Sequence, residues 1–166
     1  MGRVVVEGTD ALPLLNRLVT NDVAGVPVGQ AQYTPMCYPD GGTVDDMLVY
    51  RMDEQRYLLV VNAASRTADL AWISDHAASW QSEAAVEDRS ASWAMLALQG
   101  PAAASLLQRL TEADVTVLQP FSFLQDVTVA GVPVAVLSRT GYTGEDGFEM
   151  MVQRDDAPVL WERLLT

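Results

Sequence analysis

Two adjacent carboxylates, Asp45 and Asp46, stand directly before the apolar run 47–50, Met-Leu-Val-Tyr. The run follows a glycine-containing turn and predicts a β-strand. Side chains alternate along a strand, so the two carboxylates are expected to point to opposite faces of the sheet. Charges are rarely buried without a partner. The residues alone leave two interpretations open: one aspartate caps the hairpin while the other is solvated, or one of them faces the interior or a cavity.

A second unusual segment is residues 139–149, Arg-Thr-Gly-Tyr-Thr-Gly-Glu-Asp-Gly-Phe-Glu. Its three glycines permit backbone conformations that other residues avoid, and an aromatic ring, Tyr142, and two carboxylates stand among them. A turn alone does not need such a loop. The alternative interpretation is a wide hairpin with the tyrosine packed over it. Arg139 is expected to form an ion pair with Asp146 or Glu149.

The composition excludes several kinds of chemistry. All ten basic residues are arginine and the net charge is −12. Without lysine there is no Schiff-base amine and no P-loop lysine, and an acidic chain lacks the basic surface that nucleic acid requires. Cys37 is the one cysteine, which excludes an internal disulfide and a cysteine-based metal cluster and fits a reducing cytoplasm. No apolar run reaches the length of a membrane span and no signal peptide is visible.

The elements that must position these residues follow from periodicity and turn signals. Residues 30–62 predict three consecutive strands, joined at 40–42 and at 52–56. The helix expected at 63–78 has as buried candidates Ala64, Ala68, Leu70, Ala71 and Trp72. The other expected elements are strands at 3–7, 83–88, 93–98, 126–130 and 134–138, helices at 8–18, 100–110 and 155–165, and a turn at 131–133.

The same pattern occurs twice, at an offset of 92 residues. Six residues of the first helix region have identical counterparts in the second, namely Gly8, Ala11, Leu14, Leu15, Arg17 and Leu18 against Gly100, Ala103, Leu106, Leu107, Arg109 and Leu110. The order of the elements is also repeated, which chance alone does not readily produce. The sequence therefore predicts an α+β fold of two related half-domains, residues 1–90 and 91–166, each an antiparallel sheet flanked by helices.

Several motifs resemble one family. They are Gln-Tyr-Thr at 32–34, Asp-Gly-Gly-Thr-Val-Asp-Asp at 40–46, Val-Val-Asn-Ala at 60–63, Leu-Gln-Gly-Pro at 98–101 and Ser-Arg-Thr-Gly-Tyr-Thr-Gly-Glu-Asp-Gly-Phe-Glu at 138–149. Together they resemble the aminomethyltransferase of the glycine cleavage system, the T-protein, over essentially the whole chain. The resemblance implies tetrahydrofolate as cofactor and the lipoylated H-protein as partner. It also implies transfer of a one-carbon unit that leaves 5,10-methylenetetrahydrofolate and ammonia.

The resemblance also implies which residues form the site. Asp46 matches the family's essential aspartate, which approaches the reacting edge of the folate. Such a carboxylate could orient the folate nitrogens, stabilise developing positive charge, or take up a proton. The positions that match the pterin site are Tyr33, Asn62 and Glu145, with Tyr142 and Met1 as further cofactor contacts. A carboxylate such as Glu145 can accept two N–H bonds from a pterin edge, and tyrosine rings offer it a flat surface.

The chain departs from the family in length. Family members begin before its first strand and continue beyond Thr166 with an arginine near the folate and a further β-rich domain. The chain is therefore interpreted as a fragment, expected to bind tetrahydrofolate weakly and to lack aminomethyl transfer by itself. Three alternatives stay open: the folate-binding module of a sarcosine or dimethylglycine oxidising enzyme, a non-catalytic folate-binding protein of iron–sulfur cluster assembly, and an acidic α+β domain without a ligand.

Overall fold

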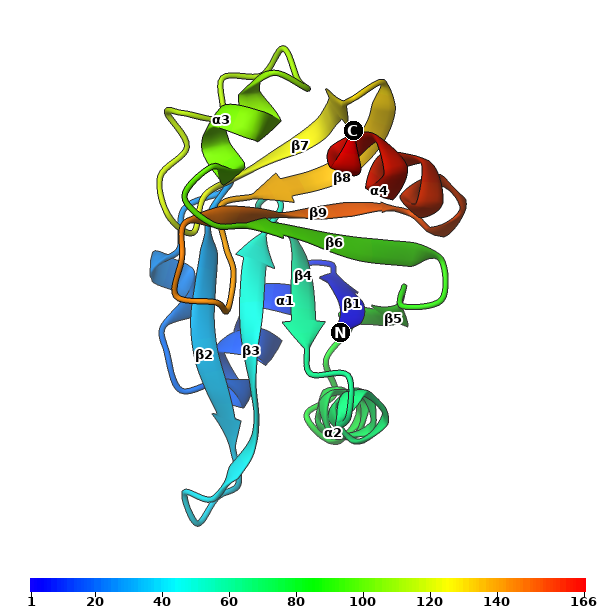
Figure 1. Ribbon diagram of the computed structural model, residues 1–166. Helices are drawn as coiled ribbons and strands as arrows, with labels where there is room; N and C mark the ends of the chain where they lie inside the picture. The colour runs from blue at the N-terminus through cyan, green and yellow to red at the C-terminus, as the bar shows by residue number, and fades with distance from the viewer. The chain divides into compact units, whose positions relative to one another are not determined.

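Two antiparallel β-sheets, each with its own helices and hydrophobic core, make up the computed structural model, which describes residues 1–166 (Figure 1). The first sheet belongs to a unit of Met1–Ser90 and the second to a unit of Ala91–Thr166. The α+β class and the antiparallel sheets flanked by helices confirm the predicted fold class.

The first unit contains a five-stranded sheet in the order β2-β3-β4-β1-β5. Its elements are β1 (Gly2–Glu7), α1 (Ala11–Leu18), a 3-10 helix (Val23–Gly25), β2 (Ala31–Cys37), β3 (Thr43–Arg51), β4 (Arg56–Val61), α2 (Arg66–Ser79) and β5 (Ala85–Asp88). The three consecutive strands predicted for residues 30–62 are β2, β3 and β4. At the turn between β2 and β3, Gly41 has φ +89°, a conformation that other residues rarely adopt.

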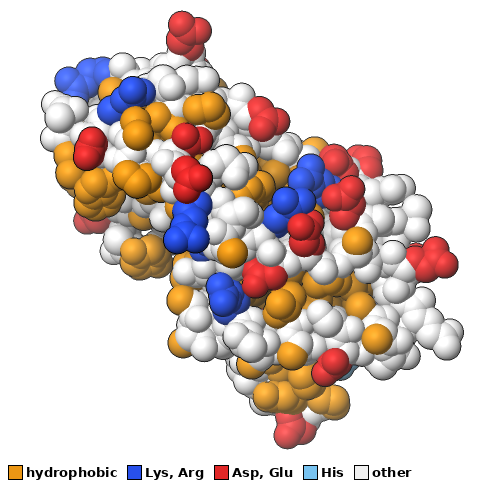
Figure 2. Space-filling view, turned by 90° about the vertical axis from the view of Figure 1, so that its right-hand side faces the viewer, with side chains coloured by type: hydrophobic (Ala, Val, Ile, Leu, Met, Phe, Trp, Pro, Cys, Tyr) orange, Lys and Arg blue, Asp and Glu red, His pale blue; other side chains and the backbone are white.

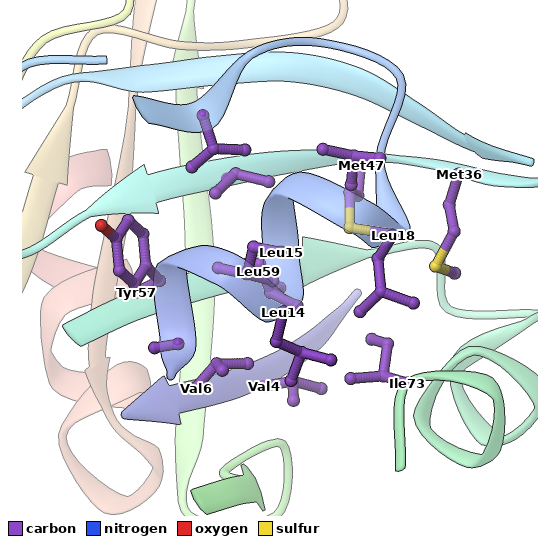
Figure 3. Close-up of a cluster of buried hydrophobic side chains, with 14 of the residues drawn as sticks. Val4, Val6, Leu14, Leu15, Leu18, Met36, Met47, Tyr57, Leu59 and Ile73 are labelled. Atoms are coloured by element: carbon purple, nitrogen blue, oxygen red, sulfur yellow. The ribbon is translucent and has the colours of Figure 1, made fainter. Parts of the chain in front are cut away.

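The core of the first unit lies between one face of this sheet and the helices α1 and α2 (Figure 3). Apolar residues of α1 recur at helical spacing and are all buried, namely Ala11, Leu14, Leu15 and Leu18. They meet alternate residues of the strands, among them Val4, Val6, Met47 and Leu59. Ile73 of α2 closes the same cluster. This packing fixes the ends of β3 and β4, where the candidate site residues lie.

The second unit contains a four-stranded sheet in the order β6-β9-β8-β7. Its elements are β6 (Trp93–Gln99), α3 (Ala103–Gln108), β7 (Phe123–Val129), β8 (Val132–Ser138), β9 (Gly147–Gln153), a 3-10 helix (Arg154–Asp156) and α4 (Ala157–Leu165). Both helices lie against one face of the sheet (Figure 1), where Leu107 of α3 and Leu160 of α4 join Phe148 and Met150 of β9 in one core.

The structure confirms the internal repeat. In sequence order, β6, β7, β8 and β9 correspond to β1, β2, β3 and β4, and these four strands have the same order in both sheets, with β5 as an additional strand of the first. Gly8 and Gly100 have φ of +119° and +120°, and their carbonyl oxygens accept the backbone N–H of Ala11 and Ala103 at 3.0 and 2.9 Å. Each unit therefore uses a left-handed glycine to turn from its first strand into its first helix.

Two local predictions were wrong. Helix α2 begins at Arg66 and buries Asp69, Ile73 and Ala77, whereas the predicted alanines 64, 68 and 71 are exposed. The predicted turn at 131–133 is shifted, since the turn residues are Ala130 and Gly131, with φ of +50° and +74°, and β8 already begins at Val132. Alanine carries too little apolar surface to decide which helix face is buried. A two-residue turn of type I′ needs positive φ at both positions, which alanine rarely adopts and therefore does not signal.

The surface reflects the acidic composition. On the face shown in Figure 2, arginine side chains are scattered among aspartate, glutamate and apolar side chains and form no continuous basic area. None of the helices has the length and apolar character needed to cross a membrane.

Candidate functional site

The first group of predicted site residues gathers at one end of the first sheet. Asp46 of β3 pairs with Pro35 of β2, and Met47 pairs with Val61 of β4, so Asn62 lies beside Asp46 where β4 ends. Tyr33 lies two residues before Pro35 and therefore on the same face as Asp46. Three neighbouring strands thus position the three side chains of Tyr33, Asp46 and Asn62.

Hydrogen bonds hold the Asp46 carboxylate from both sides. Asn62 Nδ2 donates to Asp46 Oδ1 at 2.7 Å, and the Tyr33 hydroxyl donates to Asp46 Oδ2. The hydrogen bond to Asp46, followed by partial burial and the charges of Asp46 and Asp45, raises the pKa of the Tyr33 hydroxyl, so Tyr33 remains a proton donor. Tyr33 is 53% exposed and Asp46 half-buried. The result is an oriented carboxylate that solvent or a ligand can reach.

Asp45 points to the opposite face, as the alternation along the strand predicted. It pairs with the buried Met36 and accepts the Ser65 hydroxyl at 2.5 Å. Asn62 Nδ2 also donates to Asp45 Oδ1 at 2.8 Å, so one amide group joins both carboxylates at the end of the sheet. Burial alone would raise the pKa of Asp45, but hydrogen bonds from Ser65, Asn62 and Asp69 outweigh it and lower the pKa to about 2.

Met1 lies at the same end of the sheet. Strand β1 pairs Gly2 with Val61, so Met1 and Asn62 are the next residues along the two strands. Met1 is 48% exposed, and its carbonyl oxygen accepts a hydrogen bond from the Arg3 guanidinium. The structure therefore brings four of the predicted site residues, Met1, Tyr33, Asp46 and Asn62, to one end of the first sheet.

The second group lies on the loop between β8 and β9. Tyr142 is 82% exposed and Glu145 is also exposed. Arg139 pairs with Asp146, through Nε at 2.9 Å and Nη2 at 2.7 Å, which confirms one of its two predicted partners. Since Tyr142 and Glu145 belong to the second unit, their convergence with Asp46 stays a prediction.

Gln99 anchors this loop, a role that the sequence did not reveal. Its Nε2 donates to the carbonyl oxygens of Thr140, at 3.1 Å, and Phe148, at 3.2 Å. Two of the loop glycines lie directly against its amide: a Cβ at Gly147 would stand 2.6 Å from Gln99 Cδ, and a Cβ at Gly141 would overlap the amide oxygen. These two glycines are therefore required by a close approach rather than by an unusual backbone conformation.

Two further carboxyl groups were not recognised as buried. Glu149 is 5% exposed and accepts the Thr140 hydroxyl at 2.5 Å through Oε2. Burial raises its pKa, against the opposing effect of Thr140. Asp69 is fully buried, and burial, its hydrogen bond to Asp45 and the charge of Asp45 raise its pKa to about 7. For Asp69 the usable signal was its spacing with Ile73 and Ala77, which places it on the apolar side of α2.

Comparison with known proteins gives one consistent result. The family model described as GCVT N-terminal domain matches residues 1–166. The aminomethyltransferases of Bacillus subtilis (strain 168) and Geobacillus kaustophilus (strain HTA426) are 50% and 54% identical over 165 residues, which is 99% of this chain and 44% of each relative. The chain thus spans less than half the length of the curated relatives it matches.

Solved structures show the same likeness. The glycine cleavage system aminomethyltransferase T from Bartonella henselae matches 99% of this chain and 43% of its own, with a TM-score of 0.85 and 32% identity. The heterotetrameric sarcosine oxidase from Corynebacterium sp. U-96 matches 98% of this chain and 76% of its own, with a TM-score of 0.69 and 20% identity. The second likeness shows the shared fold alone.

Proposed function

Because the chain belongs to the GCVT N-terminal domain family, we propose that it is the folate-binding part of an aminomethyltransferase of the glycine cleavage system. The proposed substrate is an aminomethyl group on the lipoyl arm of the H-protein, and the proposed products are 5,10-methylenetetrahydrofolate, ammonia and the dihydrolipoyl H-protein. The observation that carries the proposal is the Asp46 carboxylate, held by Tyr33 and Asn62 at an accessible edge of the sheet.

The residues at this edge suit a folate. A pterin is a flat ring with hydrogen-bond donors and acceptors along its edge, and tetrahydrofolate supplies the nitrogen nucleophiles that accept the one-carbon unit. Asn62 Oδ1 has no donor in the structure, because both short contacts of Asn62 use Nδ2. It is therefore free to accept an N–H of the ligand. The exposed ring of Tyr33 offers a flat surface beside it.

Asp46 has the central role in the proposed mechanism. Its position is fixed before a ligand arrives, because Tyr33 and Asn62 each hold one of its oxygens. A carboxylate fixed in this way stabilises positive charge that develops at a neighbouring nitrogen as the C–S bond of the donor breaks. Each oxygen retains a lone pair that can orient an N–H of the substrate or take up a proton from it.

The second unit is proposed to supply the remaining contacts. Tyr142 is the most exposed large side chain of the loop and Glu145 lies three residues further on, so both can reach a ligand. Glu149 is a second candidate for the pterin-binding carboxylate, because it is buried, has a raised pKa and is held by Thr140. Substitution of each glutamate by glutamine, followed by folate titration, separates the two.

The partner and compartment follow from the same proposal. We infer the lipoylated H-protein as the macromolecular partner, a role in one-carbon metabolism, and a cytoplasmic location consistent with a single free cysteine. The sarcosine-oxidising alternative is supported by the fold alone, at 20% identity. The relatives at about 50% identity, all described as aminomethyltransferases, favour glycine cleavage.

Calorimetric titration with tetrahydrofolate tests the proposal. It is performed on this chain and on a chain of the relatives' full length, each as wild type, Asp46→Asn and Asp75→Asn, the last being a control carboxylate exposed on α2. We expect the short chain to bind tetrahydrofolate weakly and the long chain to bind it tightly. In a separate assay of aminomethyl transfer by the long chain, only the Asp46→Asn variant should lose activity. Wild-type transfer rates in Asp46→Asn would refute the role of this carboxylate, and equally tight binding by both lengths would show that the short chain holds the complete site.

A further inference from the structure

Asp69 is an acidic residue at a position where no cationic side chain forms an ion pair with it. It lies in the first part of α2 on the helix face that also carries Ile73 and Ala77, and its exposed fraction is 0%. Both carboxyl oxygens are buried and neither accepts a hydrogen bond from a donor group. An ionised carboxylate in such a place would lose its hydration without compensation, which is one of the costliest arrangements in a protein interior.

The neighbour of Asp69 is a second carboxyl group, Asp45, whose proximity and charge add to burial in raising the pKa of Asp69. Two carboxylates in contact cannot both be ionised at low cost. The hydrogen-bond donors around the two carboxyl groups decide which of them keeps the proton. Asp45 accepts from the Ser65 hydroxyl at 2.5 Å and from Asn62 Nδ2 at 2.8 Å, whereas neither oxygen of Asp69 has a hydrogen-bond partner and the Ser65 hydroxyl makes only the smallest contribution to its pKa, a lowering one. The negative charge therefore belongs on Asp45, and the proton on Asp69.

The pair is connected to the proposed site by one side chain. Asn62 Nδ2 carries two hydrogens, and its two short contacts are Asp45 Oδ1 at 2.8 Å and Asp46 Oδ1 at 2.7 Å. Because both partners are acceptors, the amide must present Nδ2 rather than Oδ1 to them. A continuous set of hydrogen bonds thus runs from Asp45 through Asn62 to Asp46 and ends at the exposed Tyr33, and the buried Asp69 neighbours Asp45 at its inner end.

We propose that Asp69 is a positioning residue for the site: as a neutral acid it donates to Asp45, which fixes Asn62 and thereby the orientation of Asp46. This inference rests on the proposed transferase function only for its effect on turnover. The protonation of Asp69 is a property of the fold itself and can be measured without any substrate.

Loss of the Asp69 proton should disturb all the hydrogen bonds between Asp45 and Tyr33. With Asp69 ionised, Asp45 and Asp69 repel each other, and a displaced Asp45 no longer holds the first hydrogen of Asn62. Burial raises the pKa of Asp69 most, and Asp45 of β3 is the titratable group that raises it further; together they outweigh the Ser65 hydroxyl, which lowers it, and the preference of a helix N-terminus for negative charge. Since the pKa of Asp69 is raised to about 7, the disturbance should begin near neutral pH.

The first test observes the proton directly. Infrared spectra of this chain between pH 5 and pH 9 should contain a protonated-carboxyl C=O band that shifts in D2O and disappears as the pH rises through about 7. The component that disappears near pH 7 should be missing from Asp69→Asn and present in the control Asp75→Asn, and it should also remain in Glu149→Gln, which removes the other buried carboxyl group with a raised pKa. Carboxyl ¹³C resonances of the wild type, labelled at aspartate, give the same answer without any variant. An Asp69 that titrates near the ordinary aspartate pKa would overturn the proposal.

The second test measures the consequence in a chain of the relatives' full length. Asp69→Asn keeps the volume and an N–H donor toward Asp45 but cannot ionise, so it should retain kcat and remove a fall in kcat above pH 7. Asp69→Leu keeps the volume without a donor, so kcat should fall about tenfold or more at every pH with KM for the H-protein unchanged. Equal pH profiles for wild type and Asp69→Asn would refute the positioning role. An inactive wild type would refute the proposed function instead, and the infrared result would still decide the protonation of Asp69.

Discussion

The sharpest stability prediction concerns the contact between Gly141 and Gln99. The substitution Gly141→Ala adds one methyl group at a position where the backbone φ is not positive, so the new residue brings no backbone strain of its own. The methyl group would, however, overlap the Gln99 amide oxygen and approach Cδ to 2.7 Å. Gln99 must therefore leave its place, and it then loses the hydrogen bonds from Nε2 to Thr140 and Phe148.

The magnitude follows from those two bonds. Each contributes about 1 kcal/mol net, so Gln99→Ala should cost about 2 kcal/mol. Gly141→Ala should cost about 3 kcal/mol, because displacement of Gln99 loses the same bonds and adds about 1 kcal/mol of rotamer strain. Once Gln99 is alanine the overlap is gone, and Gly141→Ala should then cost about 0.5 kcal/mol or less. The double variant is expected to be about 2.5 kcal/mol more stable than additivity requires.

Hydrogen exchange followed by mass spectrometry measures these free energies within the second unit. The relevant peptides cover β6 and β9, which pair from Trp93 with Gln153 to Gln99 with Gly147. Gly144→Ala is the matched control in the same loop, because Gly144 has φ +79° and no atom within 4 Å of a new Cβ. It should cost about 1 kcal/mol whether or not Gln99 is present. Additive effects of Gly141→Ala and Gln99→Ala would refute the close-approach explanation for this glycine.

Three further predictions concern the first unit. Tyr33→Phe removes the hydroxyl that holds Asp46, so kcat of a full-length chain should fall about tenfold, while unfolding should show a loss of about 1 kcal/mol or less; an unchanged kcat would contradict the role of this bond. Gly2→Ala places a Cβ 2.6 Å from Val61 Cγ2 and should lower the free energy of unfolding, measured by urea titration, by about 1–3 kcal/mol, whereas Gly25→Ala, whose nearest atom is 3.6 Å away, should be nearly neutral. The raised pKa of Asp69 means that the folded state binds a proton that the unfolded chain releases, so the free energy of unfolding should fall as pH rises from about 4 to about 7 and then level off. Asp69→Asn should flatten this slope. An identical slope in both proteins would argue against a raised pKa of Asp69.

The fold was predictable because its signals are local or repeated. The turn at 40–42, the apolar strands and the helix beginning after Gly8 are each specified by a few neighbouring residues. The repeat at an offset of 92 residues then doubled that information, and the structure bears it out in the shared strand order of the two sheets. The exact start of α2 and the turn at 130–131 were missed, since each depends on a choice of one or two residues that apolar periodicity does not make.

The resemblance named the candidate site residues, whereas the contacts between residues far apart in the chain could not be predicted from the sequence. Asn62 and Asp46 are 16 residues apart and meet only because β3 and β4 pair in one register. Gln99 meets the loop 41 to 49 residues later in the sequence. Asp69 was overlooked because aspartate on a helix is ordinarily solvated, although its spacing with Ile73 and Ala77 places it on the apolar side of α2.

The candidate site residues of the two units do not occupy equivalent positions of the internal repeat. In the first unit they lie where β3 starts and β4 ends, the end of that hairpin away from its loop. In the second unit the exposed Tyr142 and Glu145 lie on the loop that joins β8 to β9, the opposite end of the corresponding hairpin. What the two units share, such as the left-handed Gly8 and Gly100, builds the scaffold. The repeat therefore predicts the fold and carries no information about the candidate site residues, which lie at opposite ends of the corresponding β-hairpins of the two units.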